Sequence, residues 1–157
     1  MYRIRPYRPE DRQQVELRFA EMLNYERGLD KHTVQGEPVA TPYMEWLLAE
    51  CAQKQGMIFV AEAASEVVGF VSLYVEHEPD ITTDFNDYVY ISDFSVSAVH
   101  RGRGIGSALL AQAETYAREI GQKMLKLDVL TNNDIALSVY RRFGLHPYVM
   151  SMLKELD

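Results

Sequence analysis

The 157-residue sequence has one cysteine, no long apolar run and no excess of positive charge, and each absence excludes a class of protein. The lone cysteine, Cys51, rules out an internal disulfide and fits a reducing compartment. No apolar run approaches the roughly 18 residues that a membrane-spanning helix requires. The first six residues are charged early and lack an apolar core, which argues against a signal peptide. We therefore expect a cytoplasmic protein that does not bind membranes.

The charge balance is one-sided, because 23 acidic residues outnumber 16 basic ones and leave a net charge of −7. This balance argues against nucleic acids and anionic membranes as partners. The acidic excess either attracts a cationic substrate or only favours solubility, and the sequence leaves both open. The four histidines have no ligand spacing such as His-x-x-x-His, so we expect no metal site.

Hydrophobic periodicity and turn residues divide the chain into strands and helices, without repeats or a linker, so we expect one domain over residues 1–157. Strands are expected near Ile4 and at 57–63, 67–76, 88–97, 123–130 and 148–153. Helices are expected from Pro9 to Gly28, from Pro42 to about Gly56, and at 107–120 and 134–143. The order β-α-α-β-β-β-α-β-α-β indicates a mixed α/β (α+β) domain around one central sheet.

The most informative segment is a glycine-rich loop, Arg101-Gly102-Arg103-Gly104-Ile105-Gly106, between a predicted strand and a predicted helix. Glycine allows positive φ and the close approach of a ligand to the backbone. The start of the following helix offers unpaired N–H groups and a partial positive charge. The two arginines add forked cationic donors. The loop therefore predicts a ligand that carries phosphate.

Two common phosphate-binding loops do not match this segment. Gly106 is followed by Ser107-Ala108 and not by the Lys-Ser/Thr pair of a nucleotide-hydrolysing P-loop. The glycine spacing is Gly-x-Gly-x-Gly, which differs from the Gly-x-Gly-x-x-Gly of dinucleotide loops. The segment instead resembles the Gln/Arg-x-x-Gly-x-Gly/Ala signature of the GNAT superfamily of N-acetyltransferases. The resemblance extends over about residues 88–148 and includes an Asn…Ala…Tyr…Phe-Gly pattern, carried by Asn132-Asn133, Ala136, Tyr140 and Phe143-Gly144.

This resemblance implies acetyl-coenzyme A as cosubstrate and a mixed central sheet with helices on both faces. The pyrophosphate would bind to main-chain N–H groups of Arg101, Gly102, Arg103, Gly104, Ile105, Gly106 and Ser107. Members of the family hold a pair of neighbouring strands apart around the pantetheine arm, here residues 88–97 and 123–130. The main chain of Phe94 and Val96 would face that arm, and the N–H near Val96 would face the thioester oxygen. Asn132 and Ala136 match positions near the arm, although Asn132 could also cap the last helix.

The resemblance also implies catalytic roles. Tyr140 matches the usual general acid, which protonates the departing thiolate; the other interpretation is a core residue of the last helix. The general base is less defined, because a strand position that often carries an acid holds Tyr90 here. Asp93 is the first candidate for the base and Glu76 the second, although Asp93 also fits a purely structural carboxylate. Direct attack needs no enzyme nucleophile, and Cys51 is expected to be a buried bystander.

The acceptor site is expected between the first two helices and the acidic turn after residue 76, where carboxylates and aromatic rings suit a cation. The residues concerned are Tyr25, Glu26, Asp30, Trp46, Glu76, Glu78, Asp80, Asp84 and Asp87. The expected acceptor is a small cationic amine or a protein amine. A coenzyme A-binding sensor without turnover and the transfer of a longer acyl chain remain alternatives. The resemblance also allows a homodimer through residues 148–153.

Overall fold

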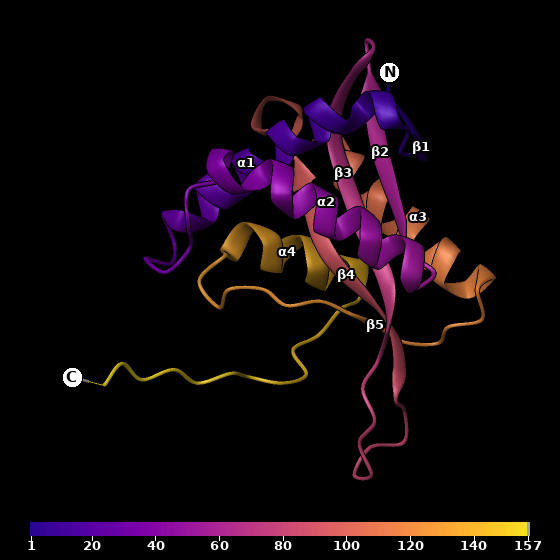
Figure 1. The fold of residues 1–157 in the computed structure, drawn as a ribbon, viewed down its shortest axis with the longest axis vertical. Coiled ribbons are helices and arrows are strands. Elements are labelled where there is room, and N and C mark those ends of the chain that lie inside the picture. The colour runs from indigo at the N-terminus through magenta and orange to yellow at the C-terminus, as the bar shows by residue number, and fades with distance from the viewer. Residues whose placement is uncertain (157) are drawn as a thin grey trace.

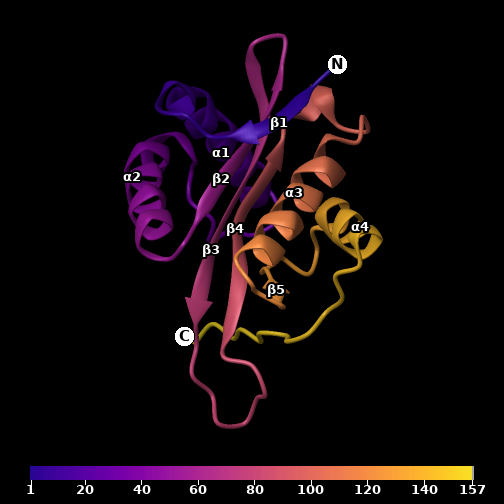
Figure 2. The same cartoon turned by 90° about the vertical axis from the view of Figure 1, so that its right-hand side faces the viewer.

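The computed structural model describes residues 1–156, which form a five-stranded sheet with helices on both of its faces (Figures 1 and 2). The strands lie in sequence order across the sheet, and only the last pair is parallel. They are β1 (Arg3–Pro6), β2 (Met57–Ala63), β3 (Glu66–His77), β4 (Asp87–Val96) and β5 (Leu125–Lys126). This architecture confirms the expected mixed α+β class and the first nine elements of the expected order.

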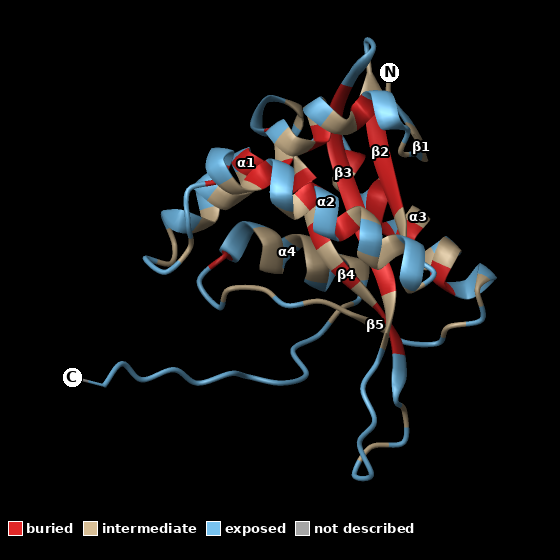
Figure 3. Ribbon diagram, viewed as in Figure 1, coloured by how far each residue is buried: buried red, intermediate tan, exposed pale blue. Residues whose placement is uncertain are grey.

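The four helices form two layers because the central strands are apolar on both faces. Helices α1 (Arg12–Arg27) and α2 (Glu37–Gln53) cover one face, while α3 (Ile105–Glu119) and α4 (Asp134–Phe143) lie on the other (Figure 2). In β3, Phe70 packs towards α1 and α2 and the next residue, Val71, packs towards α3. The buried residues accordingly follow the strands between the layers (Figure 3). Within residues 1–156, no helix combines the length and the hydropathy that crossing a membrane requires.

Helix α2 begins at Glu37, five residues before the predicted start at Pro42. Pro38 occupies the first turn, the position in a helix that tolerates proline best, and Pro42 lies inside the helix. At the N-cap, Gly36 packs directly on α1: a Cβ placed there would lie 2.4 Å from the carbonyl oxygen of Ala20. This contact between helices, which the local sequence does not reveal, sets where α2 begins.

The parallel pair β4–β5 is much shorter than the predicted strand at 123–130. It consists of Val89 opposite Leu125 and Tyr90 opposite Lys126, together with a 2.9 Å hydrogen bond from the Val89 N–H to the Met124 oxygen. Strand β4 then continues to Val96 with β3 on one side and, among the described residues, no strand on the other. The two chain segments therefore diverge beyond Tyr90, as the resemblance implied.

The prediction of a last strand at 148–153 was wrong. Residues 145–156 contain no helix or strand and run as an extended, exposed tail (Figure 3). Leu145 is partly buried, but from residue 148 onwards the exposed fractions of the large apolar side chains range from 62% at Tyr148 to 86% at Met152. A β-prone run becomes a strand only where a neighbouring strand pairs with it and buries its side chains, and this tail has no such neighbour within the described chain.

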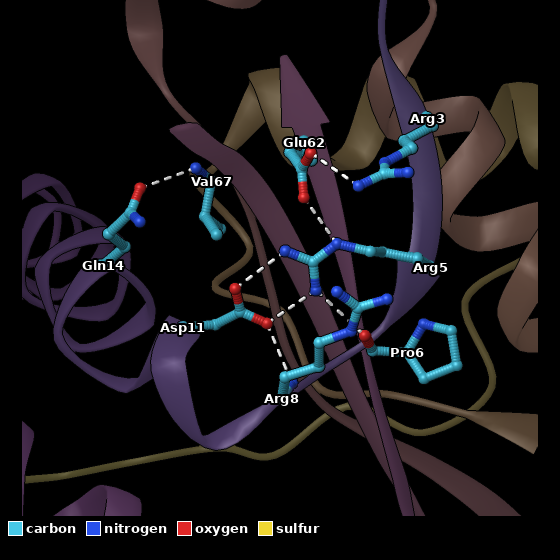
Figure 4. A network of polar contacts seen from close by, with 8 residues as sticks. All are labelled: Arg3, Arg5, Pro6, Arg8, Asp11, Gln14, Glu62 and Val67. Atoms are coloured by element: carbon cyan, nitrogen blue, oxygen red, sulfur yellow. Dashed lines mark hydrogen bonds and ion pairs between the residues drawn. The ribbon is translucent and has the colours of Figure 1, made fainter. Parts of the chain in front are cut away.

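The outer edge of the sheet is joined to α1 by a buried ion pair (Figure 4). From β1, Arg5 donates two hydrogen bonds to Asp11, at 2.7 and 2.8 Å, and its Nε contacts Glu62 of β2. The Arg8 N–H donates to Asp11 at 2.8 Å. These donors hold the pKa of the Asp11 carboxyl below its usual value despite burial. The pair links the first strand to the start of α1.

Candidate active site

A cavity of about 240 Å³ lies where β4 and the segment after β5 separate. Helices α1, α2 and α4 contribute the rest of its wall. Three carboxylates face it, and the lining contains no lysine, arginine or histidine. We call it the acidic cavity; its lining residues are Phe19, Met22, Leu23, Glu26, Tyr43, Ile91, Ser92, Asp93, Phe94, Leu127, Asp128 and Tyr140. Charge and shape together suit a narrow cationic group.

Asp93 of β4 lies on the inner wall of the acidic cavity and is 4% exposed. Its carboxylate accepts hydrogen bonds from three hydroxyl groups. The Tyr43 hydroxyl lies 2.9 Å from both oxygens, and Ser72 and Ser92 donate to Oδ2 at 2.6 and 2.9 Å. Burial raises the pKa of Asp93, and the three hydroxyl groups oppose that rise. The sequence did not reveal these donors, since two of them come from α2 and β3.

Tyr140 of α4 also faces the acidic cavity, and its ring packs on Phe94 with the centroids 5.8 Å apart. Burial raises the pKa of the phenol, and the negative charges of Glu26 and Asp93 raise it further. The hydroxyl therefore keeps its proton at neutral and moderately alkaline pH. Tyr140 thus packs against the core, as a core residue of the last helix would, and also lines the cavity, as a catalytic residue would.

Glu26, near the end of α1, is the one predicted acceptor residue that lines the acidic cavity. The pKa of its carboxyl is raised by burial and by the charge of Asp93. The other eight predicted acceptor residues, which include the second candidate base Glu76, lie outside the lining. Asp128 completes the set of carboxylates and accepts a 3.1 Å hydrogen bond from Tyr90. Tyr90 stands at the strand position that often carries an acid in the family, and here its hydroxyl donates a hydrogen bond to the carboxylate of Asp128.

The glycine-rich loop has the backbone that a phosphate seat requires. Gly102 and Gly104 have φ values of +74° and +80°, and α3 starts immediately afterwards at Ile105. No side chain caps this helix, so the N–H groups of its first turn have no partner within the helix. A Cβ on Gly106 would lie 3.0 Å from the Phe94 ring. Glycine at this position therefore allows the loop to approach the strand that borders the cavity.

The open edge of β4 starts beside this loop. The Ser97 N–H donates to the Val68 oxygen on β3 at 2.8 Å, and bonding directions alternate along a strand. Phe94 and Val96 therefore direct their main-chain groups to the side without a strand. The Nε of Arg101 donates to the Val96 oxygen at 3.1 Å, and its guanidinium lies 5.7 Å from the Tyr25 ring. Arg103 is exposed.

The start of α4 corrects one expectation. Asn133 is the cap of this helix, because its side chain accepts a 3.2 Å hydrogen bond from the Ala136 N–H. Asn132 is not the cap: its amide donates to the Leu29 oxygen at 3.0 Å, across to the segment after α1. Among the described residues, no group of three or more His, Cys, Asp or Glu side chains is arranged to hold a metal ion.

Comparison with known proteins agrees with this geometry. The model of the acetyltransferase (GNAT) family matches residues 20–145. An uncharacterised N-acetyltransferase of Methanocaldococcus jannaschii is 31% identical over 75% of this chain and 50% of its own length. Streptothricin acetyltransferase of Streptomyces lavendulae is 34% identical over 61% of this chain and 48% of its own. The chain thus spans about half the length of these two relatives.

A third relative is covered more fully. Aminoglycoside N(6')-acetyltransferase type 1 of Stenotrophomonas maltophilia is 29% identical over 68% of this chain and 71% of its own. Among solved structures, a GCN5-related N-acetyltransferase from Ralstonia eutropha superimposes with a TM-score of 0.78 at 26% identity, covering 99% of each chain. AAC(6')-Iy bound to a bisubstrate analogue of coenzyme A gives 0.74 at 16% identity over 100% of this chain and 99% of its own. With a family model matching well over half of its length, this chain belongs to the GNAT acetyltransferase family.

Proposed function

We propose that the protein transfers the acetyl group of acetyl-coenzyme A to a primary amine by direct attack within a ternary complex. The observation that carries this proposal is the acidic cavity between β4 and the segment after β5, whose wall residue Phe94 lies against Gly106 of the glycine-rich loop. The relatives named above as acetyltransferases of aminoglycosides and of streptothricin support the reaction class. A solved neighbour in complex with a coenzyme A analogue supports the cosubstrate.

In this proposal the loop residues from Arg101 to Ser107 bind the pyrophosphate through main-chain N–H groups at the start of α3. The pantetheine arm pairs with the free main-chain groups of Phe94 and Val96, in the place that a further strand would take. Asn132 and Ala136, at the start of α4, stay predicted contacts of the arm. The Arg101–Val96 contact yields to the arm on binding, because both use the same carbonyl oxygen.

Acetyl transfer from a thioester to an amine requires a proton donor and a proton acceptor. The leaving thiolate derives from a thiol of pKa about 8.5, so a donor assists its departure. We assign this donation to Tyr140, whose raised pKa keeps the phenol protonated. An alkylamine has a pKa of about 10.4 and must lose a proton before it attacks. Asp93 stays a prediction for this base, and Glu26 is a second carboxylate in the lining of the acidic cavity.

We propose a small cationic amine as the acceptor and a protein amine as the alternative that the same cavity would admit. Three carboxylates without a lysine, arginine or histidine attract an ammonium group by Coulomb interaction. The volume of about 240 Å³ is below the roughly 300–1,000 Å³ of sites that hold drug-sized ligands, so a small amine or one end of a larger molecule enters. Bulkier portions of the molecule would stay outside.

Thiol release tests the proposal. The protein is mixed with acetyl-coenzyme A and a panel of cationic, neutral and acidic primary amines, and coenzyme A is measured over time. We expect faster release with cationic amines than with the others. Acetyl-coenzyme A binding without release on any amine would favour the coenzyme A sensor. Acidic amines that react as fast as cationic ones would refute the assigned acceptor class. If a longer acyl-coenzyme A released coenzyme A faster than acetyl-coenzyme A does, the assigned acyl donor would change.

We also propose a homodimer that uses the exposed run at 148–153, which pairs with no strand of its own described chain. Apolar side chains in such numbers are typical of a surface that another chain covers. Light scattering would give the mass of the full chain and of a variant with Val149, Met150 and Met152 changed to serine. A dimer in both proteins, or a monomer in both, would argue against this contact.

A further inference from the structure

We propose that Glu26 receives the ammonium group of the acceptor and accepts its proton, while Asp93 is a positioning residue. The proposal rests on the acetyl transfer proposed above and names the group that starts it. It follows from the different surroundings of two carboxylates, on α1 and on β4, that line the acidic cavity.

The oxygens of Asp93 are already occupied. Three hydroxyl groups, from Tyr43, Ser72 and Ser92, lie within 2.9 Å of them, and Asp93 is only 4% exposed. Oδ2 lies within hydrogen-bonding distance of all three hydroxyl groups and Oδ1 of the Tyr43 hydroxyl, so a proton added to this carboxylate would compete with these donors. The same bonds join α2, β3 and β4 behind the cavity. The geometry therefore suits a fixed negative charge that orients the Tyr43 hydroxyl and the wall around it.

Glu26 has the opposite surroundings. Its side chain projects from α1 into the acidic cavity, half-buried, and the described chain offers it no hydrogen bond and no ion pair. An ionised carboxylate in such a place gains most from a partner of opposite charge. An acceptor ammonium that enters the cavity supplies that partner.

The groups around Glu26 carry no positive charge into the cavity. They are Asp93 from β4, Tyr43 from α2, Asp128 from the segment after β5, and Tyr140 from α4. The guanidinium of Arg101 lies outside the lining, against the ring of Tyr25. Burial and the charge of Asp93 both favour the protonated form of Glu26, which raises its pKa towards that of a useful base.

The proton balance is simple. The ammonium gives one proton to Glu26, and the neutral amine forms the new C–N bond at the thioester carbon. The C–S bond breaks, its electron pair stays on sulfur, and Tyr140 supplies a proton to that sulfur. The nitrogen loses its second proton as the amide forms, which restores the phenol. One proton leaves the protein from Glu26, so no other reactant is needed.

The first test is the pH dependence of kcat/KM for n-butylamine with Glu26→Gln, Asp93→Asn and the control Glu21→Gln. Glu21 lies on the same helix, is exposed and pairs with Arg18. For Glu26→Gln we expect a loss of about 100-fold at pH 7 that shrinks towards pH 10, where the free amine needs no base. For Asp93→Asn we expect a loss of constant size across pH. The reverse pattern, or a Glu26→Gln profile equal to that of Glu21→Gln, would overturn the proposal.

A second test does not require turnover. Calorimetry measures the affinity of n-butylamine, and of the neutral n-butanol, for protein saturated with coenzyme A. We expect Glu26→Gln to weaken amine binding about tenfold and to leave n-butanol and coenzyme A binding unchanged. An unchanged amine affinity in this variant, or no amine binding by the native protein, would overturn the role of Glu26. Amine binding that depends on Glu26 without any thiol release would instead refute only the proposed reaction.

Discussion

The substitution Gly104→Asp probes the phosphate seat most directly, with Gly104→Ala as its matched control. Gly104 has φ of +80° and is the last residue before α3. A Cβ there would lie 3.5 Å from the Tyr2 hydroxyl, which is ordinary contact, so no steric clash is introduced. Both variants share the strain of a side chain at positive φ. They differ by one negative charge where the pyrophosphate is proposed to bind.

The backbone strain and the added charge can be separated by the size of their effects. A non-glycine residue in the left-handed region costs about 1–2 kcal/mol, which lowers the melting temperature of both variants alike. At about 5 Å and an effective dielectric constant of about 20, two unit charges repel by about 3 kcal/mol. Ionic screening reduces this value. We therefore expect Gly104→Asp to bind acetyl-coenzyme A about 100-fold more weakly than Gly104→Ala, which itself stays close to the native affinity.

Calorimetric titration with acetyl-coenzyme A at two salt concentrations checks this expectation, with thermal unfolding measured in parallel. The difference in affinity between the two variants should narrow at high salt. Equal affinities for the aspartate and alanine variants, with both still folded, would show that no phosphate binds beside residue 104. The assignment of the loop would then be wrong.

Three further outcomes are expected. Tyr140→Phe should lower kcat by about 10²-fold and leave acetyl-coenzyme A affinity unchanged in calorimetry, because the ring contacts remain; an unchanged kcat would remove Tyr140 from the mechanism. Asp11→Asn should lower the free energy of unfolding in urea by about 1–3 kcal/mol, because Arg5 loses one of its two carboxylate partners and keeps only Glu62. Because the pKa of Asp11 is lowered in the folded protein, its contribution to the free energy of unfolding is complete above a pH of about 4 and is lost as the pH falls through the lowered pKa. If acid destabilised the variant and the native protein equally, this reasoning would be contradicted. Burial raises the pKa of Cys51 to about 11, so at pH 7.5 its alkylation by iodoacetamide, followed by mass spectrometry, should be far slower than in urea-unfolded protein, and equal rates would contradict its burial.

Local sequence was sufficient where one short-range cause decides the structure. The positive-φ glycines of the loop and the stop at Gly144 follow from residues next to one another, and α3 starts at Ile105, two residues before the predicted start at 107. The start of α2 did not follow, because contact between Gly36 and Ala20 of another helix outweighed the signal at Pro42. The tail at 148–153 has the composition of a strand, but strand formation depends on a partner that composition cannot show.

The candidate site shows the same division. The resemblance to a family motif was sufficient to predict Tyr140, Asp93 and Phe94 as site residues, and all three line the acidic cavity. Tyr43 was missed, although it donates to Asp93, because no local pattern separates it from any other half-buried helical tyrosine. Of the predicted acceptor carboxylates, only Glu26 reaches the cavity, since direction on a helix depends on how that helix packs.

The order of residues alone determined the family, the glycine-rich turn and the kinds of side chain available for catalysis, because these depend on spacing along the backbone. Only the tertiary structure decided which carboxylate is sealed by hydroxyl groups and which one stands open to an incoming amine. The two carboxylates differ because their burial and hydrogen bonding depend on how three helices, β4 and the segment after β5 pack around the cavity, and this packing is a property of the folded chain.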